Sequence, residues 1–259
     1  MRFVLDAGHR NNSKDFGACG HGLKESVLAL AIVKKLKYAL EKLGVEVVLT
    51  RSSEDEIITP SQRPVKAKQL KGDVLVSVHI NAYKNDSASG IEVLYKTQKE
   101  LATVVCNGMC KETGAKNRGA KYRDDLAVLN GFNESILVEC GFISNRIEAN
   151  LLNQSAYQDK IVKGIVEGIR THYKLQEVDT ALYDAVERII ESGIMINATA
   201  WNKLDNIKLQ NVPALLSKFG GVDVLIAKGV ISSADIWKNG TYTKDNVRSL
   251  LIKYSVKLG

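Results

Sequence analysis

Short apolar runs alternate with longer amphipathic stretches along the first two thirds of the chain. The apolar runs predict buried strands at residues 2–6, 45–50, 73–80, 90–96, 126–129 and 135–140. The amphipathic stretches predict helices at about 23–43, 61–71, 97–113, 145–153 and 155–173. In the first of these helices, Leu28, Ile32, Leu36 and Leu40 recur every four residues and form one apolar face.

The connections between these elements indicate the strand directions. Strands joined through a helix can run parallel, whereas strands joined by a few turn residues run antiparallel. Strands 73–80 and 90–96 are separated by a short polar loop, so this pair is expected to be antiparallel. The same holds for 126–129 and 135–140, which are separated by turn residues. The basic stretch 116–123 shows no strand pattern and is expected to be irregular.

The pattern changes after residue 174. Residues 1–174 are expected to form one α/β domain, with a mixed, mostly parallel sheet and helices on both faces. After a short polar break, residues 179–259 show no strand pattern and repeat at an offset of 35–36 residues. The matched positions are Gly193 and Gly229, Trp201 and Trp237, Asn211-Val212 and Asn246-Val247, Leu215-Leu216 and Leu250-Leu251, and Phe219 and Tyr254. This repeat predicts a small all-α domain of two tandem units, in which each tryptophan belongs to the core of its unit or contacts a ligand.

Positive charge is concentrated in the first domain. Residues 1–174 hold 26 Lys+Arg against 20 Asp+Glu, and residues 175–259 hold 10 against 9, which together give the net charge of +7. A basic domain suits an anionic polymer such as nucleic acid or bacterial cell wall, although general solubility explains the charge equally well.

The sequence shows no nucleic-acid motif and no segment long enough to span a bilayer, so we expect neither nucleic acid nor membrane as a partner. The amino terminus enters a strand at once and leaves no room for a signal peptide, which predicts synthesis in the cytoplasm of the host cell.

Four side chains suited to metal binding and proton transfer lie at element ends. His9 follows the first strand, His79 and Glu139 lie near the ends of theirs, and Glu25 opens the first long helix. The carboxyl ends of parallel strands share one edge of a sheet, where open α/β folds place their chemistry. Two imidazoles and one carboxylate would hold zinc and leave one position open for water, as in catalytic zinc sites. Glu139 would activate that water, or would be a fourth ligand that closes the site. The residues predict a zinc hydrolase.

Six motifs in the same region resemble the landmarks of a known family. They are Leu5-Asp6-Ala7-Gly8-His9, Gly22-Leu23-Lys24-Glu25, Leu49-Thr50-Arg51, Val76-Ser77-Val78-His79-Ile80-Asn81-Ala82, Gly90-Ile91-Glu92-Val93 and Val138-Glu139-Cys140-Gly141-Phe142-Ile143-Ser144-Asn145. In this order they resemble the zinc-dependent N-acetylmuramoyl-L-alanine amidases of the amidase-3 type, which occur among bacterial wall hydrolases and phage endolysins. The alternative is a non-catalytic wall-binding protein with the shape of an amidase. The presence of all four candidate metal-binding and proton-transfer side chains argues against this alternative.

The resemblance implies a reaction and a role for each residue. Zinc would be held by His9, Glu25 and His79, with Glu139 as the catalytic glutamate. The bond cleaved would be the amide between N-acetylmuramic acid and the L-alanine of the stem peptide in peptidoglycan. From their positions next to the site, Asn81 and Glu92 are candidate substrate-binding residues. For Asn81 the alternative is a role in orienting a loop, and for Glu92 a plain surface charge.

The tail resembles helical repeats that follow the catalytic domain in clostridial phage and sporulation amidases. This resemblance implies a domain that targets the bacterial cell wall, through peptidoglycan or a secondary wall polymer. A self-association module, which would give a homodimer, is the alternative. Together with the short chain, the repeat suggests a phage or prophage endolysin of a Gram-positive host. The sequence leaves open the host range and the choice between phage lysis and lysis during sporulation.

Overall fold

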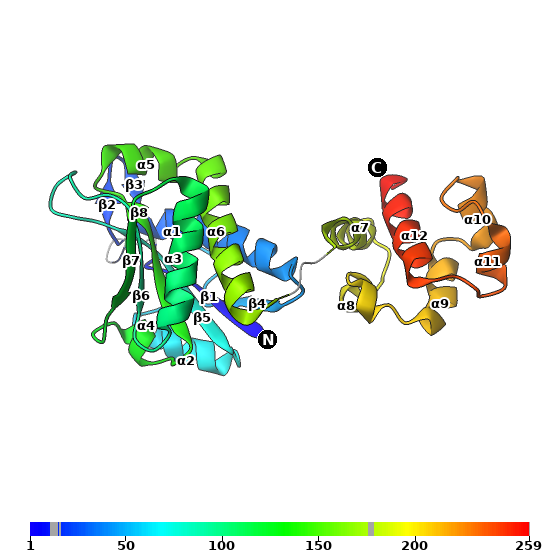
Figure 1. The fold of residues 1–259 in the computed structure, drawn as a ribbon, viewed down its shortest axis with the longest axis horizontal. Coiled ribbons are helices and arrows are strands. Elements are labelled where there is room, and N and C mark those ends of the chain that lie inside the picture. The colour runs from blue at the N-terminus through cyan, green and yellow to red at the C-terminus, as the bar shows by residue number, and fades with distance from the viewer. Residues whose placement is uncertain (11–14, 16, 176–178, 259) are drawn as a thin grey trace. The chain divides into compact units, whose positions relative to one another are not determined.

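The computed structural model describes residues 1–10, 15, 17–175 and 179–258 (Figure 1). The chain divides into two compact units, Met1–Gln176 and Glu177–Gly259, and each is described by itself. Among the described residues, none of the helices combines the length and the apolar character that crossing a membrane requires.

A six-stranded sheet forms the centre of the first unit. Its strands are β1 (Arg2–Ala7), β4 (Glu46–Leu49), β5 (Val74–Asn81), β6 (Ile91–Tyr95), β7 (Asn117–Tyr122) and β8 (Ser135–Phe142). They lie in the order β4-β1-β5-β8-β6-β7. All neighbouring pairs are parallel except β6 and β8, which are antiparallel. The predicted mixed, mostly parallel sheet is therefore confirmed.

Helices cover both faces of this sheet, because successive residues of each strand point to opposite sides. On one face, residues such as Phe3 and Leu5 form the larger core with α1 (Glu25–Glu41), α3 (Lys99–Thr113) and α6 (Ser155–Tyr173). On the other face, Val4 packs in a smaller core with α2 (Gln62–Gln69) and α4 (Ala127–Asn130). The helix α5 (Arg146–Leu152) follows β8, and Asn145 caps it by accepting hydrogen bonds from the N–H groups of Ile147 and Glu148.

Two sequence predictions about this sheet are wrong. Most of the apolar run 126–129 lies in the short helix α4, with Leu126 as its N-cap, so the run forms no strand and β8 pairs with β5 and β6 instead. Four apolar residues are compatible with one turn of a buried helix, and Val128 and Leu129 pack in the smaller core. The basic stretch 116–123 contains the edge strand β7, which pairs only with β6 and is not buried. Because an exposed edge strand needs no apolar residues, its sequence lacks the hydrophobic pattern that predicts a strand. Strands 73–80 and 90–96 do run in opposite directions, but β8 lies between them.

The second unit is helical throughout its described residues, as predicted. Its helices are α7 (Thr180–Glu191), α8 (Ala198–Trp201), α9 (Val212–Lys218), α10 (Val222–Ala227), α11 (Ala234–Lys238) and α12 (Lys244–Val256), with short 3-10 turns η1 (Leu204–Asn206) and η2 (Leu209–Asn211). Trp201 and Trp237, the matched tryptophans of the repeat, are both buried in a single apolar core. The matched aromatic residues Phe219 and Tyr254 stack on each other, with ring centroids 3.9 Å apart and planes 10° apart. The two repeats therefore share one core.

Candidate metal centre and active site

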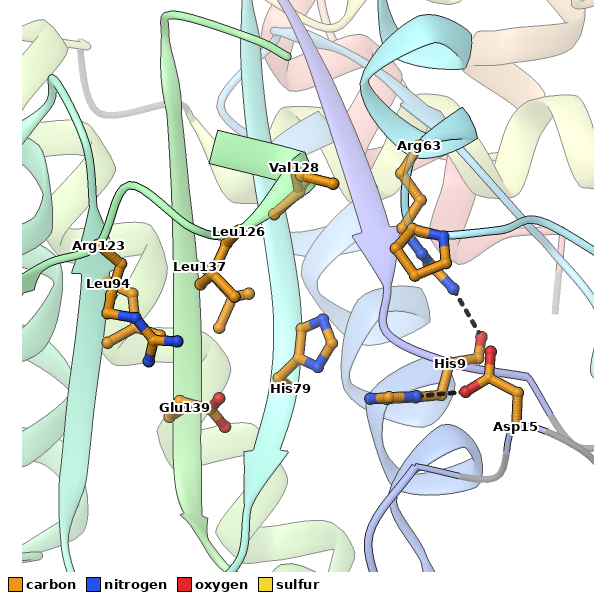
Figure 2. Close-up of a pocket in the computed structure, with 12 residues that line it drawn as sticks. His9, Asp15, Arg63, His79, Leu94, Arg123, Leu126, Val128, Leu137 and Glu139 are labelled. Atoms are coloured by element: carbon orange, nitrogen blue, oxygen red, sulfur yellow. Dashed lines mark hydrogen bonds and ion pairs between the residues drawn. The ribbon is translucent and has the colours of Figure 1, made fainter. Parts of the chain in front are cut away.

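The carboxyl ends of three neighbouring parallel strands bring the predicted histidines and Glu139 together. His79 and Glu139 are register partners on β5 and β8, and Figure 2 shows their side chains next to each other. His9 follows the end of β1, where the N–H of Gly8 donates to the carbonyl of Val78 on β5 (2.9 Å). The ring centroids of His9 and His79 lie 5.1 Å apart.

Glu25 enters the same group from the first turn of α1. Its Oε1 accepts from the backbone N–H of Ile80 (3.0 Å), and its Oε2 accepts from the N–H of Ala18 (2.7 Å). The N–H of Glu25 donates in return to the carbonyl of Ala18 (2.9 Å). A backbone N–H therefore holds each of the two carboxylate oxygens of Glu25.

The donor set of His9, Glu25 and His79 fits a zinc ion. One ligand atom from each residue lies within 4.8 Å of the others. Glu25 Oε1 is 2.8 Å from His79 Nδ1, and Glu25 Oε2 is 3.5 Å from His9 Nε2. Two imidazole nitrogens and one carboxylate oxygen are typical ligands of a catalytic zinc, which keeps a fourth position for water. Next to this group, the buried Oε2 of Glu139 has no hydrogen-bond partner among the described residues, as expected of a carboxylate that faces a ligand.

Asp15 is a member of the site that the sequence analysis missed. Its Oδ1 lies 2.6 Å from His9 Nδ1. An Nδ1–H donated to this carboxylate leaves the lone pair on Nε2, the nitrogen that faces Glu25. Carboxylates commonly hold metal-binding histidines in this way, which fixes both the tautomer and the ring orientation. Asp15 lies in a loop six residues after His9, so no periodic pattern in the sequence could have identified it.

Two glycines leave space for the ligand side chains. A Cβ built on Gly8 would lie 2.6 Å from both ring nitrogens of His79. A Cβ built on Gly17 would lie 2.5 Å from Glu25 Oε2 and 2.6 Å from His9 Cδ2, and its φ of +71° also disfavours any residue with a side chain. Both positions therefore require glycine because the side chains of His9, Glu25 and His79 pack directly on the backbone.

Two buried arginines hold the segment that carries His9. Arg51 donates to the carbonyls of Ala7 (Nε, 3.0 Å) and Gly8 (Nη2, 3.0 Å), although only 1% of its surface is exposed. Arg63 donates to the carbonyls of Ala7 (2.7 Å) and His9 (3.1 Å). His9 itself has a φ of +55°, which is uncommon outside glycine. The two arginines therefore position His9, whose backbone is in a strained conformation.

Asp6 neutralises one of these arginines inside the protein. Its Oδ1 accepts from Arg63 (2.7 Å) and from the hydroxyl of Thr50 (2.5 Å), and its Oδ2 accepts from the hydroxyl of Ser77 (2.6 Å). Burial alone would raise the pKa of Asp6, but Arg63 and the two hydroxyls lower this pKa below its ordinary value. Asp6 therefore stays ionised, and the buried pair is fully hydrogen-bonded.

The carboxylates of the site differ in their electrostatic environments. Burial would raise the pKa of Glu25, but the hydrogen bond to His79 and the charges of both histidines lower it. Burial raises the pKa of Glu139 to about 8, opposed by His79 and reinforced by the carboxylates of Glu25 and Glu92. Two acids whose environments push their pKa values apart are typical of sites in which one binds and the other transfers protons.

A cavity of about 350 Å³ opens next to the candidate metal ligands His9 and His79 (Figure 2). Its lining is polar where His9, His79 and Glu139 reach it. Most of the remaining lining is apolar and includes Leu94, Leu126, Ala127, Val128 and Leu137. Arg123 also lines the cavity, and its side chain comes from the segment that follows β7. The cavity can therefore receive a ligand with a polar reacting group and an apolar portion.

The two candidate substrate-binding residues bind each other. The Nδ2 of Asn81 donates to Glu92 Oε1 (3.0 Å), while Glu92 Oε2 accepts from Arg118 Nε and Lys121 Nζ (both 2.6 Å). Burial would raise the pKa of Glu92, but these two cations lower it. Neither Asn81 nor Glu92 lines the cavity of Figure 2. Their role in substrate binding stays a prediction, and their contacts indicate that Glu92 orients Asn81.

Comparison with known proteins agrees with this geometry. Residues 3–171 match the Amidase_3 family model, which describes N-acetylmuramoyl-L-alanine amidases. The endolysin of Bacillus phage SPP1 is 37% identical in an alignment 175 residues long, which covers 64% of this chain and 63% of that protein. The N-acetylmuramoyl-L-alanine amidase LytC of Bacillus subtilis strain 168 is 32% identical in an alignment 176 residues long, which covers 66% of this chain and 35% of that protein.

The fold of the first unit also matches solved structures. The catalytic domain of CwlV, an N-acetylmuramoyl-L-alanine amidase from Bacillus (Paenibacillus) polymyxa var. colistinus, superposes with a TM-score of 0.63 at 30% identity. The match covers 68% of this chain and 99% of that structure. The likeness is therefore to a complete catalytic domain, whereas the chain spans only about a third of LytC and under two thirds of the phage endolysin.

Proposed function

Because the chain belongs to the N-acetylmuramoyl-L-alanine amidase family, we propose that it is a zinc-dependent peptidoglycan amidase. It would cleave the amide between the lactyl group of N-acetylmuramic acid and the L-alanine of the stem peptide. The observation that supports this most strongly is the group of His9, Glu25 and His79, whose ligand atoms lie within 4.8 Å of one another next to Glu139. The 37% identity to a phage endolysin supports a role of the endolysin type, acting on the wall of a Gram-positive host.

The residues of the site have separate tasks in this reaction. His9, Glu25 and His79 would hold the zinc, and Asp15 would keep His9 in the tautomer that leaves Nε2 free. When bound, zinc supplies Lewis acidity, which polarises an amide carbonyl and lowers the pKa of water at the open position. The pKa of Glu139 would fall from about 8 in the vicinity of a divalent cation, so its carboxylate is available near neutral pH. Glu139 would then take a proton from the attacking water and deliver it to the nitrogen of the departing L-alanine.

Release of the L-alanine amino group from purified peptidoglycan tests this function. Zinc-loaded protein is expected to release it, and chelation of the metal is expected to abolish the release. Glu139→Gln is expected to bind zinc with unchanged stoichiometry but to lose about 10²–10⁴-fold in turnover, the usual contribution of a positioned acid–base group. Full activity without zinc, or near-normal turnover by Glu139→Gln, would contradict the proposal. Wall binding without any release would indicate a non-catalytic binding protein.

For the second unit we propose binding to the cell wall, through peptidoglycan or a secondary polymer. Two grooves support this, because their linings include matched positions of the two repeats. Asn197, Ala200 and Asn211 line one groove, and Ser233, Ile236 and Asn246 line the other at offsets of 35–36 residues. Each groove also contains one lysine, Lys208 in the first and Lys253 in the second. Both grooves thus offer an asparagine amide at a matched position and an ammonium group, which suit a hydrated polymer with a repeating unit.

Sedimentation of the full chain with purified host walls tests the second proposal. The Glu139→Gln background prevents digestion of the walls during the measurement. The combined variant Lys208→Ala and Lys253→Ala is expected to stay largely in the supernatant, while the control Lys228→Ala, an exposed lysine outside both grooves, sediments like the parent. Concentration-dependent dimerisation with no wall binding would instead favour the self-association module.

A further inference from the structure

The basic stretch around β7 contains one cation whose role differs from that of its neighbours. Arg118 and Lys121 both form ion pairs with Glu92, a buried acid on β6, so their charges are already paired within the protein. Arg123 follows the last residue of β7 and instead lines the cavity next to Glu139. Its backbone N–H donates to the carbonyl of Tyr95 (2.8 Å), which extends the pairing of β6 and β7 by one residue. The sheet therefore fixes where this side chain begins.

Asp125 orients the guanidinium of Arg123. Arg123 Nε donates to Asp125 Oδ1 (2.6 Å) and Nη2 donates to Asp125 Oδ2 (2.7 Å), so one edge of the guanidinium is occupied. Within the described part of the chain, Nη1 has no hydrogen-bond partner. The side chain of Arg123 is 44% exposed. An arginine carries five N–H donors in a planar fork, so the free edge can bind a second anionic group.

The other polar groups of the cavity cannot provide this contact. Arg63 also lines the cavity, but it is buried and donates to Asp6 and to backbone carbonyls. Asp15 is occupied by His9. Among the described residues that line the cavity, Arg123 is thus the arginine whose guanidinium has one edge available for a ligand. A ligand that fills the cavity would meet a zinc site at one place, an apolar wall next to it, and a positive charge at Arg123.

We propose that Arg123 binds a free carboxylate on the stem peptide, the α-carboxyl of the residue that follows L-alanine. This inference rests on the proposed amidase function. That residue is a γ-linked D-glutamate, whose α-carboxyl is either free or amidated in different walls. The group lies at most about 7 Å from the scissile nitrogen, the extended length of two residues. A sphere with the 350 Å³ volume of the cavity is about 9 Å across, so the cavity can hold both the scissile amide and this carboxylate. The enzyme therefore prefers stem peptides with the free acid.

Two soluble substrates separate this contact from every other role of Arg123. They are the N-acetylmuramoyl tripeptides L-Ala-γ-D-Glu-L-Lys and L-Ala-γ-D-isoglutamine-L-Lys, which differ only in whether the α-carboxyl is an acid or an amide. The zinc-loaded full chain is expected to show a kcat/KM about tenfold higher for the acid, which corresponds to about 1.4 kcal/mol. The preference is expected in KM with kcat unchanged, because the contact is made equally before and during reaction.

Arg123→Gln is expected to remove the preference by raising KM for the acid about tenfold while leaving the amide substrate unchanged. Arg123→Lys, which keeps the charge but loses the planar fork, is expected to retain part of it. Lys116→Gln is the matched control, because it removes one exposed charge from the same basic stretch and is expected to leave both substrates unaffected.

Three results would overturn the inference. A zinc-loaded parent that hydrolyses both tripeptides equally well shows no recognition of the carboxylate. An equal loss on both substrates in Arg123→Gln shows that Arg123 acts through Glu139 or through the fold. A loss of preference in Lys116→Gln as well would assign it to the general positive charge. A parent that hydrolyses neither tripeptide nor peptidoglycan would instead refute the amidase function itself.

Discussion

Gly8→Ala is expected to damage the metal site while leaving the fold in place. The new Cβ would lie 2.6 Å from both ring nitrogens of His79, whereas ordinary van der Waals contact begins at 3.4 Å. The nearest ring atom, Cε1, would lie only 2.4 Å away, so the ring must move by about 1.0 Å, several times the roughly 0.2 Å tolerance of a metal–ligand distance. Gly8 is not among the positive-φ residues, so its backbone accepts alanine without strain.

The expected losses follow from this displacement. Perturbing the groups that orient metal ligands typically lowers affinity about 10–100-fold, and we expect the upper end because a ligand itself moves. Misplacing a catalytic constellation by about 1 Å costs a further factor of about 10² in rate. The free energy of unfolding of the metal-free protein is expected to fall by only about 1–3 kcal/mol, the usual cost of an added methyl group in a packed site.

Competition with a zinc chelator, amide hydrolysis and urea unfolding measure these three quantities on the same samples. Gly114→Ala is the control, because Gly114 ends α3 at a φ of +74° with open space around its Cβ position. It is expected to lose about 1–2 kcal/mol of stability and to keep its zinc affinity. If Gly8→Ala bound zinc as tightly as the parent, the packing of His79 on Gly8 would not position a metal ligand.

The remaining predictions concern the acids around the site. Asp15→Asn is expected to weaken zinc binding about 10–100-fold in chelator competition, with unchanged stability, because His9 loses the carboxylate that fixes its tautomer. Unchanged affinity would show that Asp15 does not orient His9. Asp6→Asn is expected to lower the free energy of unfolding by about 3–5 kcal/mol, because Arg63 is left buried without its partner. The pKa of Asp6 is lower in the folded than in the unfolded protein, so its stabilisation is present above the unfolded value of about 3.9 and is lost as the pH falls through the folded value. Urea unfolding between neutral pH and pH 3 is therefore expected to show a shallower acid dependence in Asp6→Asn than in the parent, and equal slopes would assign acid sensitivity to other groups.

Much of the candidate site could be predicted from the sequence because chemistry and periodicity coincide there. His79 and Glu139 lie near the ends of apolar runs, and parallel strands necessarily bring such ends to one edge. Glu25 was identifiable because it opens a long amphipathic helix directly after a glycine-rich segment. In each case a strand end or a helix start determines the position of the side chain, so the sequence pattern predicts where that side chain lies.

The groups that support the site were not predictable in this way. Arg51 is a charged residue that hydropathy places at the surface, yet it is buried because the carbonyls of Ala7, Gly8 and Ser26 accept its N–H groups. Arg123 follows the edge strand β7, and the polar composition of this strand gives no hydropathy pattern that would locate Arg123. These positions depend on contacts between segments distant in sequence, which no local pattern encodes.

Anomalous X-ray diffraction at the zinc edge, from crystals of the full chain grown with zinc, would test the proposed metal site without reference to activity. A single strong peak is expected between His9, Glu25 and His79, within about 2.0–2.2 Å of one atom from each side chain. A peak at another place, or no peak at a site that retains these three residues, would contradict the assignment of the metal and with it the roles given to Glu139 and Asp15.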